Sequence, residues 1–569
     1  MNQLCKRPYL VLFVKIAILL SVYMTYLFCL PSKNETSTID TDLHKAKNKA
    51  LREELNELYK TNAQLNTRLM DLNNRLSIQH ENKSSRNASN APTKEYEHLR
   101  RRIFLNTQEF WYRIYKTFSF QMRKSNDNVK DQISKMINMF REHYTALLRD
   151  VSNLAEVDGH SKWRIQESRE LSDLVQNDIK QSQNPLNCDN ARKLVCRLFK
   201  YDCGYSCRLH HVVECLIFAF ITKRTLFLNK SNGSFSEREY ENLFLPLSDK
   251  CRLEDGYKLS ICSGNSSARV VYINALKLHN KNSPYLPFEI PVELAPRLNV
   301  LHGDPVVWWV GQFLKYIFRP LPNLSYAFEE YKNRVKFQKP IVGVQVRRTD
   351  KINREASFHE LDEYMYHVEE YYKIEEFNGK VHKKRIYLAT DEPSVFYEAK
   401  LKYPEYEIIG DPEIPKSASV TDREKDNSII NINIDIYFLS LCDYLVCTFS
   451  SNICRMAYEI MNSLHPDASL RYTSVDETYN YGHMIRRINS VVIRHDAYGL
   501  EEIGIEVGDD VFDYDNLWNG FSRGINLRTN ITGIYPTFKV TRKVETSNFS
   551  NHPYMQIDQC IFNDTYSTN

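Results

Sequence analysis

The sequence predicts an α/β fold with a long helical region before it. Ile341, Val342, Val344 and Val346 form a short apolar run of the kind found in strands buried on both faces, and polar residues follow it directly. From residue 341 to about 482, strand-like segments alternate with helical ones, which is the pattern of a sheet whose strands are joined by helices. Before residue 184, helical periodicity runs on with few Gly or Pro breaks.

Length, charge and cysteine content limit the class of protein. The 569 residues are too many for one hydrophobic core, so several domains are expected. The 75 basic and 71 acidic residues leave a formal charge of +4, which argues against nucleic-acid binding through bulk charge. Thirteen cysteines, together with sequons that all follow the N-terminal apolar segment, indicate an oxidising secretory lumen. The sequons lie at Asn34, Asn82, Asn87, Asn229, Asn232, Asn265, Asn323, Asn530, Asn548 and Asn563.

The N-terminus predicts a membrane anchor and a stem. Residues 9–30 form an apolar run close to the ~20 residues that span a bilayer. Lys6 and Arg7 before it predict a cytoplasmic N-terminus, and no small-residue cleavage pattern follows it, which favours an anchor over a cleaved signal peptide. Between Leu51 and Leu76, leucines recur at spacings of four and three, with Asn62 in the one empty place, which predicts a dimeric coiled coil. A single amphipathic stem helix is the alternative.

Residues 184–340 mix short apolar runs with turns, for example Thr225–Leu228 and Val270–Ile273. Cys203 and Cys207, with two histidines close behind, are compatible with a metal site. However, Cys-x3-Cys is not the usual zinc spacing, and the apolar helix expected at 212–220 favours a disulfide loop packed on a helix. Trp308 and Trp309 lie in a helical run and are expected in the core.

Polar side chains gather where the expected strands end. Arg347 and Arg348 end the first strand, and adjacent guanidinium groups at such a position indicate a site for a diphosphate, although a solvated charge cluster is the alternative. A second strand, Arg385–Leu388, is followed by Asp391. A third, Tyr444–Thr448, leads to serines at the start of a helix whose free N–H groups can face an anion.

Five stretches resemble, in the same order, the eukaryotic α1,6-fucosyltransferases, which place core fucose on N-glycans. They are C-G-Y-S-C-R-L-H-H-V-V from Cys203, H-G-D-P-V-V-W-W-V from His302, I-V-G-V-Q-V-R-R-T-D-K from Ile341, Y-L-A-T-D-E-P-S from Tyr387 and L-V-C-T-F-S-S-N-I-C-R-M from Leu445. Residues 483–545, with G-I-Y-P-T-F from Gly533, resemble an SH3 barrel. The resemblance covers nearly the whole chain and implies a GT-B-like glycosyltransferase with a Rossmann-type donor domain.

These features give the expected domain order, which is a cytoplasmic tail (1–8), a transmembrane signal anchor (9–30), a coiled-coil stem (40–80), a helical region (94–182), an α/β domain with disulfides (184–340), a Rossmann-type GDP-fucose-binding domain (341–482), an SH3-like domain (483–545) and a polar tail (546–569). The segment from Glu545 onward is polar and expected to be mobile. The resemblance implies a single-pass type II Golgi membrane protein with a luminal body.

The resemblance also implies site residues. The expected donor-binding residues are Arg347, Arg348, Gln345, Gly204, Tyr205, Ser206, Phe235, Asp391 and Asp435. The expected acceptor-binding residues are Asp350, Lys351, Glu355 and Asp476. Catalysis falls to Glu355 as the base, with Lys351, Arg347 and Ser451. Asp435 lies in the apolar helical run 429–441, where an acid needs a partner, and the family's partner is the guanine base.

The cysteines and three departures complete the comparison with the family. The disulfide pairs implied by the resemblance are Cys188–Cys251, Cys196–Cys215, Cys203–Cys207 and Cys447–Cys454, and they leave Cys262, Cys442 and Cys560 unassigned. Gln345 stands where the family usually has a histidine, and Leu517 where it has an acceptor-contacting histidine. Phe235 replaces a donor-contacting tyrosine.

We therefore expect an inverting enzyme that transfers fucose from GDP-β-L-fucose in α1,6 linkage to the innermost GlcNAc of N-glycans on glycoproteins, without a metal or other cofactor, as a membrane-anchored homodimer. Two alternatives remain. One is a fucosyltransferase with another acceptor, since Gln345 and Leu517 lie in the expected donor or acceptor surroundings. The other is a luminal glycan- or peptide-binding protein that keeps the fold without turnover.

Overall fold

The structure is a computed structural model that describes residues 91–198, 204–229, 240–253, 260–261, 269–274, 289–349, 352, 356–380, 383–418, 426–481 and 487–549. The chain divides into two units, Met1–Ser89 and Asn90–Asn569, and all described residues belong to the second. The expected cytoplasmic tail, membrane anchor and coiled-coil stem thus lie outside the described residues. Within the described part, none of the helices combines the length and the apolar character that crossing a membrane requires.

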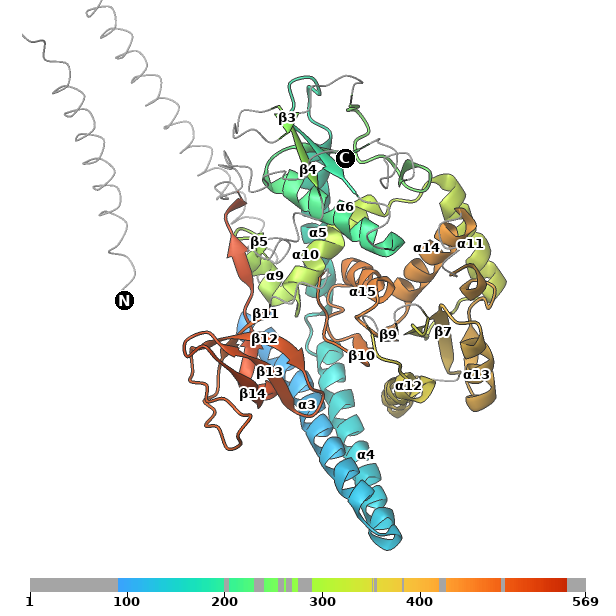
Figure 1. The fold of residues 1–569 in the computed structure, drawn as a ribbon, viewed down its shortest axis with the longest axis vertical. Helices are drawn as coiled ribbons and strands as arrows, with labels where there is room; N and C mark the ends of the chain where they lie inside the picture. The colour runs from blue at the N-terminus through green and yellow to red at the C-terminus, as the bar shows by residue number, and fades with distance from the viewer. Residues whose placement is uncertain are drawn as a thin grey trace, which may run out of the picture. The chain divides into compact units, whose positions relative to one another are not determined.

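The second unit begins with three helices, α3 (Lys94–Lys124), α4 (Asp127–Val157) and α5 (Ser161–Gln183). Thr93 and Asn126 cap the first two, because each side chain accepts a hydrogen bond from a backbone N–H group in the first turn. The helices α3 and α4 form a hairpin (Figure 1), in which the ring of Trp111 stacks on that of Tyr144 at 5.2 Å between centroids.

A first parallel sheet follows, with the strand order β2-β1-β4-β3. Its strands are β1 (Lys193–Arg197), β2 (Thr225–Leu228), β3 (Ser260–Ile261) and β4 (Val270–Asn274). The helices of this part are α6 (Tyr205–Ile221), α9 (Ala295–Leu301), α10 (Pro305–Ile317) and α11 (Pro322–Val335). The strands expected at 225–228 and 270–273 are confirmed.

The second parallel sheet has the strand order β10-β9-β6-β7-β8. Its strands are β6 (Val342–Val346), β7 (Arg385–Thr390), β8 (Glu407–Ile409), β9 (Tyr444–Cys447) and β10 (Tyr472–Ser474). Its helices are α12 (Leu361–Phe377), α13 (Ser394–Lys402), the 3-10 turn η1 (Pro415–Ala418), α14 (Asp426–Leu441) and α15 (Asn452–Leu464). From β6 the chain continues to β7 and β8 on one side of the sheet and then returns to β9 and β10 on the other side of β6. Sheets of this kind bind ligands at the carboxyl ends of the strands beside such a switch point, here between β6 and β9.

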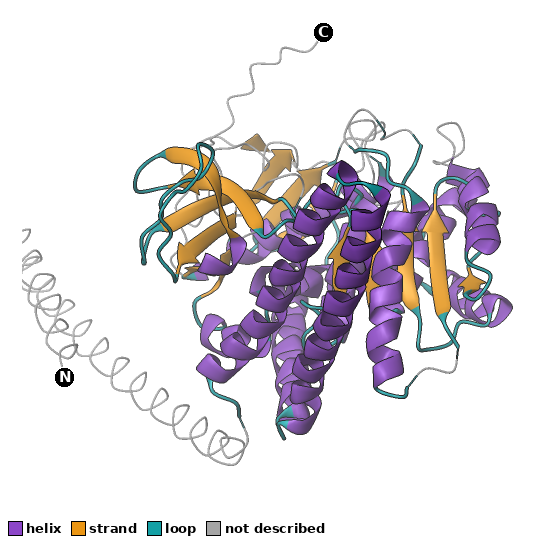
Figure 2. Ribbon diagram, turned by 90° about the horizontal axis from the view of Figure 1, so that it is seen from below, coloured by secondary structure: helices purple, strands orange, loops and turns teal. Residues whose placement is uncertain are grey.

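A five-stranded antiparallel sheet follows, with the order β14-β13-β12-β11-β15. Its members are β11 (Arg487–Val491), β12 (Asp510–Asn516), β13 (Phe521–Asn526), β14 (Ile531–Pro536), the 3-10 turn η2 (Thr537–Lys539) and β15 (Val540–Arg542). This sheet lies beside α3 (Figures 1 and 2).

The expectation that the C-terminal segment is mobile is wrong for its first residues, 545–549, while residues 550–569 lie outside the described part. Residues 545–547 form a strand, β16 (Glu545–Ser547), which pairs in parallel with β5 (Glu289–Pro291). The ring of Phe549 then contacts that of Trp309 at 5.9 Å. The composition of this segment is polar, but its backbone hydrogen bonds to β5 and this one aromatic ring fix its first residues on the α/β body.

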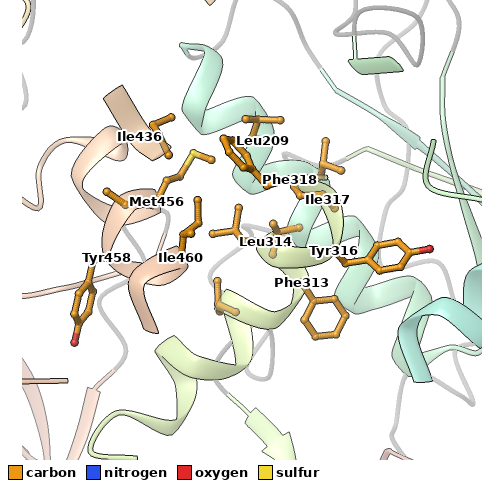
Figure 3. Packing of buried hydrophobic residues seen from close by; sticks show 14 of the residues in the cluster. Leu209, Phe313, Leu314, Tyr316, Ile317, Phe318, Ile436, Met456, Tyr458 and Ile460 are labelled. Atoms are coloured by element: carbon orange, nitrogen blue, oxygen red, sulfur yellow. The ribbon is translucent and has the colours of Figure 1, made fainter. Parts of the chain in front are cut away.

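One continuous apolar core joins the two parallel-sheet parts. On one side it contains side chains of α6 and α10, such as Leu209 and Leu314, and on the other side those of α14 and α15, such as Ile436 and Met456 (Figure 3). Trp308 and Trp309 are fully buried in it, as expected. Because the packing is shared, the helices that follow strands of the two sheets are fixed against each other.

Three of the expected disulfides are present in the structure, Cys188–Cys251, Cys196–Cys215 and Cys447–Cys454. Cys207 is also disulfide-bonded, while Cys203, its expected partner, lies outside the described residues, as do Cys262 and Cys560. Cys442 is a buried free thiol. The Cys447–Cys454 bond joins the end of β9 to the first turn of α15.

Candidate active site

Arg347 and Asp391 meet where β6 and β7 end. Nη1 of Arg347 lies 3.1 Å from Oδ2 of Asp391. The buried carboxylate also accepts hydrogen bonds from the backbone N–H groups of Arg348, at 2.8 Å, and Thr349, at 3.2 Å. One carboxylate therefore fixes both the guanidinium of Arg347 and the backbone that follows β6, which leaves Arg347 in a defined orientation at the rim of the sheet.

Arg348 turns away from Arg347, toward α13 and the segment before α12. Its Nη1 donates to Oε2 of Glu398 at 2.7 Å, and its Nε and Nη2 each donate to the carbonyl oxygen of His359 at 3.3 Å. The guanidinium carbon also lies 4.8 Å from the ring centre of Phe358. The side chain keeps only 6% of its surface exposed, compared with 18% for Arg347. Of the two arginines, Arg347 is thus the one presented at the rim.

The loop from β9 into α15 forms the neighbouring part of the rim. Ser451 is the N-cap of α15 and makes no side-chain capping bond. Asp476 holds the loop, because its carboxylate accepts from the backbone N–H groups of Phe449, at 2.8 Å, and Ser450, at 3.3 Å. The Oγ atom of Ser450 is buried and finds no hydrogen-bond partner within the described part of the chain. The chain from β9, the strand paired with β6, thus leads into the positive end of a 13-residue helix, which favours an anion at this rim.

Gln345 adds a second unpaired group close to the end of β6. It points to the opposite face of the sheet from Val344 and Val346, and it is 2% exposed. Its Oε1 atom has no hydrogen-bond partner among the residues described. Buried polar atoms are rarely left unpaired, so an acceptor in this position is suited to a donor group supplied by a ligand.

A hydrogen bond joins the first turn of α6, which carries three expected donor residues, to α14, the helix that carries Asp435. Gly204 is the N-cap of α6, and the hydroxyl of Tyr205 accepts a hydrogen bond from Nδ2 of Asn433 on α14 at 3.0 Å. Ser206 is buried in the same turn. Asp435, two residues beyond Asn433, accepts a hydrogen bond from the hydroxyl of Tyr387 at 2.9 Å. This is the partner that an acid in an apolar helix requires.

Burial changes the chemistry of Asp435. It raises the pKa of this carboxyl from 3.8 to about 7, although the hydrogen bond from Tyr387 lowers it in part. The Tyr387 hydroxyl lies 3.3 Å from that of Tyr331, so the acid ends a short chain of hydroxyl groups. At neutral pH this carboxyl therefore exchanges readily between an acceptor-only form and a form that also donates.

Four of the expected site residues have no described position. Asp350, Lys351, Glu355 and Phe235 all lie outside the described residues. Their roles as acceptor contacts, base and donor contact therefore stay predictions. Among the residues that the structure describes, no group of three or more His, Cys, Asp and Glu side chains is arranged to hold a metal ion.

Comparison with known proteins decides the family. A family model described as alpha-(1,6)-fucosyltransferase N- and catalytic domains matches residues 2–480. The chain belongs to the alpha-(1,6)-fucosyltransferase family. An alpha-(1,6)-fucosyltransferase of Drosophila melanogaster is 43% identical over 462 residues, which are 80% of this chain and 74% of the relative. One of Caenorhabditis elegans is 34% identical over 436 residues, 74% of this chain and 78% of the relative.

Solved structures of other fucosyltransferases are more distant. A mutant of Arabidopsis thaliana FUT1 in complex with GDP is 13% identical, covers 52% of this chain and 77% of its own, and gives a TM-score of 0.31. The NodZ alpha-1,6-fucosyltransferase soaked with GDP-fucose is 15% identical, covers 48% of this chain and 92% of its own, and gives a TM-score of 0.27. Family membership rests on the family model and the two curated relatives, which make the chain a glycosyltransferase.

Several contacts around this rim were not expected from the sequence. His210 on α6 shares a hydrogen bond between its Nε2 and Oε2 of Glu459 on α15 at 2.8 Å, and Tyr479 donates to the other oxygen of Glu459 at 2.6 Å. Glu398 binds Arg348, and Trp518 contacts Asp476. None of these contacts could be predicted from local pattern, because each joins residues that are 20 or more positions apart in the chain.

A cavity of about 560 Å³ lies between α3, the antiparallel sheet and the segment before α10. Its walls include Glu109, Asp304, Arg487 and Trp518 but none of the expected donor residues. Burial, with a smaller contribution from the nearby Asp513, raises the pKa of Glu109 from 4.5 to about 7, although the hydrogen bond from Asn516 lowers it in part.

Proposed function

We propose that this fucosyltransferase transfers fucose from GDP-β-L-fucose in α1,6 linkage to the innermost GlcNAc of N-glycans, with inversion at the anomeric carbon. Membership in the family and the two relatives named alpha-(1,6)-fucosyltransferase support this. The observation that supports this site is the ion pair between Arg347, at the end of β6, and Asp391, next to the switch point where β9, which leads into α15, lies beside β6.

The donor fits this rim in three places. Arg347 and the N–H groups at Ser450 and Ser451 would hold the diphosphate, since both present positive charge to an anion. Arg348, tied to Glu398, would keep the loop in place. Asp435 would accept hydrogen bonds from guanine. The space between the diphosphate and the guanine would be lined by Gln345, Gly204, Tyr205 and Ser206. Phe235 and Asp391 complete the proposed donor set.

The reaction exchanges one glycosidic bond for another. The bond between fucose C1 and the β-phosphate oxygen breaks, and its electron pair leaves with GDP, whose growing negative charge Arg347 and the α15 N-terminus stabilise. The 6-hydroxyl of GlcNAc forms the new bond to C1 from the opposite face, so the β-linked donor becomes an α-linked product. The hydroxyl proton passes to Glu355, directly or through Lys351 and Ser451.

The acceptor side rests on Asp350, Lys351, Glu355 and Asp476, with help from the C-terminal antiparallel sheet. This sheet has the order β14-β13-β12-β11-β15, so that β15, its last strand in the chain, pairs with β11, its first strand in the chain. This arrangement supports an SH3-like module. In the same way, two parallel sheets on one continuous core support a GT-B-like arrangement with a Rossmann-type donor half. Leu517 lies in the turn after β12 and replaces the histidine of the family, so acceptor preference is where this chain would differ.

The proposed setting is the Golgi lumen. The apolar run at 9–30 would anchor a single-pass type II protein, and the leucine pattern before residue 80 would pair two chains. Three disulfides fit an oxidising compartment. The reaction would need no metal, because Arg347 and a helix N-terminus take the role that a divalent cation has in other glycosyl transfers.

The full chain in detergent, incubated in EDTA with GDP-fucose and a GlcNAc-terminated N-glycan, tests the proposal. The expected product carries one added fucose that a linkage-specific α1,6-fucosidase removes from the innermost GlcNAc. Arg347→Ala should abolish transfer, whereas Arg334→Ala, an exposed arginine on α11 that pairs with Asp411, should not. Release of GDP without glycan modification would mean another acceptor. Absence of both binding and transfer would favour the binding-protein alternative.

A further inference from the structure

We propose that Trp518 is a positioning residue for the active site: it holds, through Asp476, the loop that leads from β9 into α15. Trp518 lies in the turn between β12 and β13, on the C-terminal antiparallel sheet, and not on either parallel sheet. The effect on donor binding rests on the proposed function, while the effect on the loop itself does not.

The contact runs through a single residue. Nε1 of Trp518 donates a hydrogen bond to the backbone carbonyl oxygen of Asp476 at 2.7 Å. The carboxylate of the same Asp476 accepts from the backbone N–H groups of Phe449 and Ser450, and from Oγ of Ser474 at 2.9 Å. Asp476 therefore stands between the indole and the backbone that leads into α15, and a shift of its main chain moves the carboxylate that holds that backbone.

The backbone of Trp518 is itself held in an uncommon conformation. Its φ is +50°, in the left-handed region that bulky residues rarely occupy. The Oδ1 atom of Asn516 accepts a hydrogen bond from the Trp518 N–H group at 2.8 Å, and the ring of Tyr112 on α3 meets the indole edge-on at 5.8 Å. Such a conformation persists only where the surroundings impose it, and these contacts do so while aiming the indole N–H at Asp476.

Helix α3 supplies the fixed base for this turn. Nδ2 of Asn516 donates to Oε1 of Glu109 on α3 at 2.7 Å, and the guanidinium of Arg113 lies 4.9 Å from the ring centre of Phe521. A Cβ at Gly520, where φ is +88°, would come within 3.1 Å of Cβ of Arg113, so this close approach requires glycine. The contacts thus run from α3 through the turn to Asp476 and the site loop.

Trp518→Phe tests the proposal, because it keeps an aromatic ring and removes only the N–H donor. Tyr514→Phe on β12 is the matched control, since the Tyr514 hydroxyl makes no hydrogen bond to any residue that the structure describes, and it is 38% exposed. Hydrogen–deuterium exchange on the full chain without nucleotide reports the loop directly, and calorimetric titration with GDP reports the donor site.

In Trp518→Phe, the peptide that contains Phe449 and Ser450 should exchange ~3- to 10-fold faster, the range expected for loss of one neutral hydrogen bond. The GDP dissociation constant should rise by a similar factor, with no change at distant peptides of the first parallel sheet. Tyr514→Phe should change neither quantity. A merely structural role for Trp518 would lower the melting temperature without this local change.

Unchanged exchange at this loop in Trp518→Phe would overturn the proposal, whatever the GDP titration gives. If the wild-type chain binds no GDP, the proposed function fails, but the exchange experiment still decides the positioning role. If Trp518→Phe does not fold, Asn516→Ala replaces it, because it removes the hydrogen bond that orients the Trp518 backbone. Faster loop exchange in that variant would support the proposal, and wild-type exchange would refute it.

Discussion

Replacing Glu109 by Gln should stabilise the protein at neutral pH and not at acidic pH. Glu109 is buried between α3 and the antiparallel sheet, and its Oε2 atom has no hydrogen-bond partner within the described ranges. Burial first, and the charge of Asp513 second, raise its pKa in the folded state from 4.5 to about 7. Glutamine keeps an oxygen that can accept the hydrogen bond from Asn516 and carries no charge at any pH.

The magnitude follows from linkage. The folded state binds the Glu109 proton more tightly than the unfolded state does. The stabilising contribution of protonated Glu109 to the unfolding free energy is therefore complete below about pH 4.5 and is lost as pH rises through about 7. Each pKa unit is worth about 1.4 kcal/mol, so ionised Glu109 costs about 3 kcal/mol of unfolding free energy above pH 7. Below pH 4.5 both side chains are neutral, and the two proteins should unfold alike.

Urea unfolding of the full chain, measured from pH 4.5 to 8, tests this reasoning. Glu109→Gln should match the wild type at pH 4.5 and exceed it by about 3 kcal/mol at pH 8. The matched control is Glu142→Gln, an exposed position on α4, which should show no such trend. A Glu109→Gln difference that is absent at pH 8, or equally large at both ends of the range, would refute the assignment.

Three further predictions concern the site and the core. Arg347→Lys should weaken GDP binding ~10-fold or more in calorimetric titrations, because an ammonium group lacks the planar fork that grips a diphosphate, and equal affinity would argue against this contact. Since burial raises the pKa of Asp435 to about 7, wild-type GDP affinity should fall as pH drops below 7, while Asp435→Asn should bind more weakly with a flat profile. Burial raises the pKa of the Cys442 thiol, so iodoacetamide should label it only in urea, and native labelling seen by mass spectrometry would contradict its placement.

Much of the fold and part of the site follow from local pattern. Apolar runs that end in polar residues correctly place β6, β7 and β9, and parallel strands bring their carboxyl ends to one edge, where Arg347 and Asp391 meet. The serines expected at the start of a helix do lead into one, α15 (Asn452–Leu464). The need of Asp435 for a partner was also predictable, because burial of a carboxylate is costly, although the sequence does not indicate that Tyr387 is that partner.

The remaining contacts depend on distant packing. Asn516 and Glu109 are 407 residues apart, and the sequence around neither residue predicts the hydrogen bond between them. Arg347 and Arg348 look equivalent in sequence. In the structure, however, Arg348 binds Glu398 on α13, whereas Arg347 pairs with Asp391. The segment at 545–547 has a polar composition that indicates mobility, yet β5 gives its backbone a hydrogen-bonding edge. These contacts depend on which residue of a distant segment packs against a given side chain or backbone group. The neighbouring residues in sequence do not indicate that partner.

We propose that the donor diphosphate lies at the switch point between β6 and β9. A crystal or cryo-EM structure of the protein with GDP tests it most directly. The β-phosphate oxygens should lie within about 3 Å of the Arg347 guanidinium and of backbone N–H groups at the start of α15, with guanine beside Asp435. A diphosphate bound elsewhere, with Arg347 still paired only to protein groups, would contradict the account.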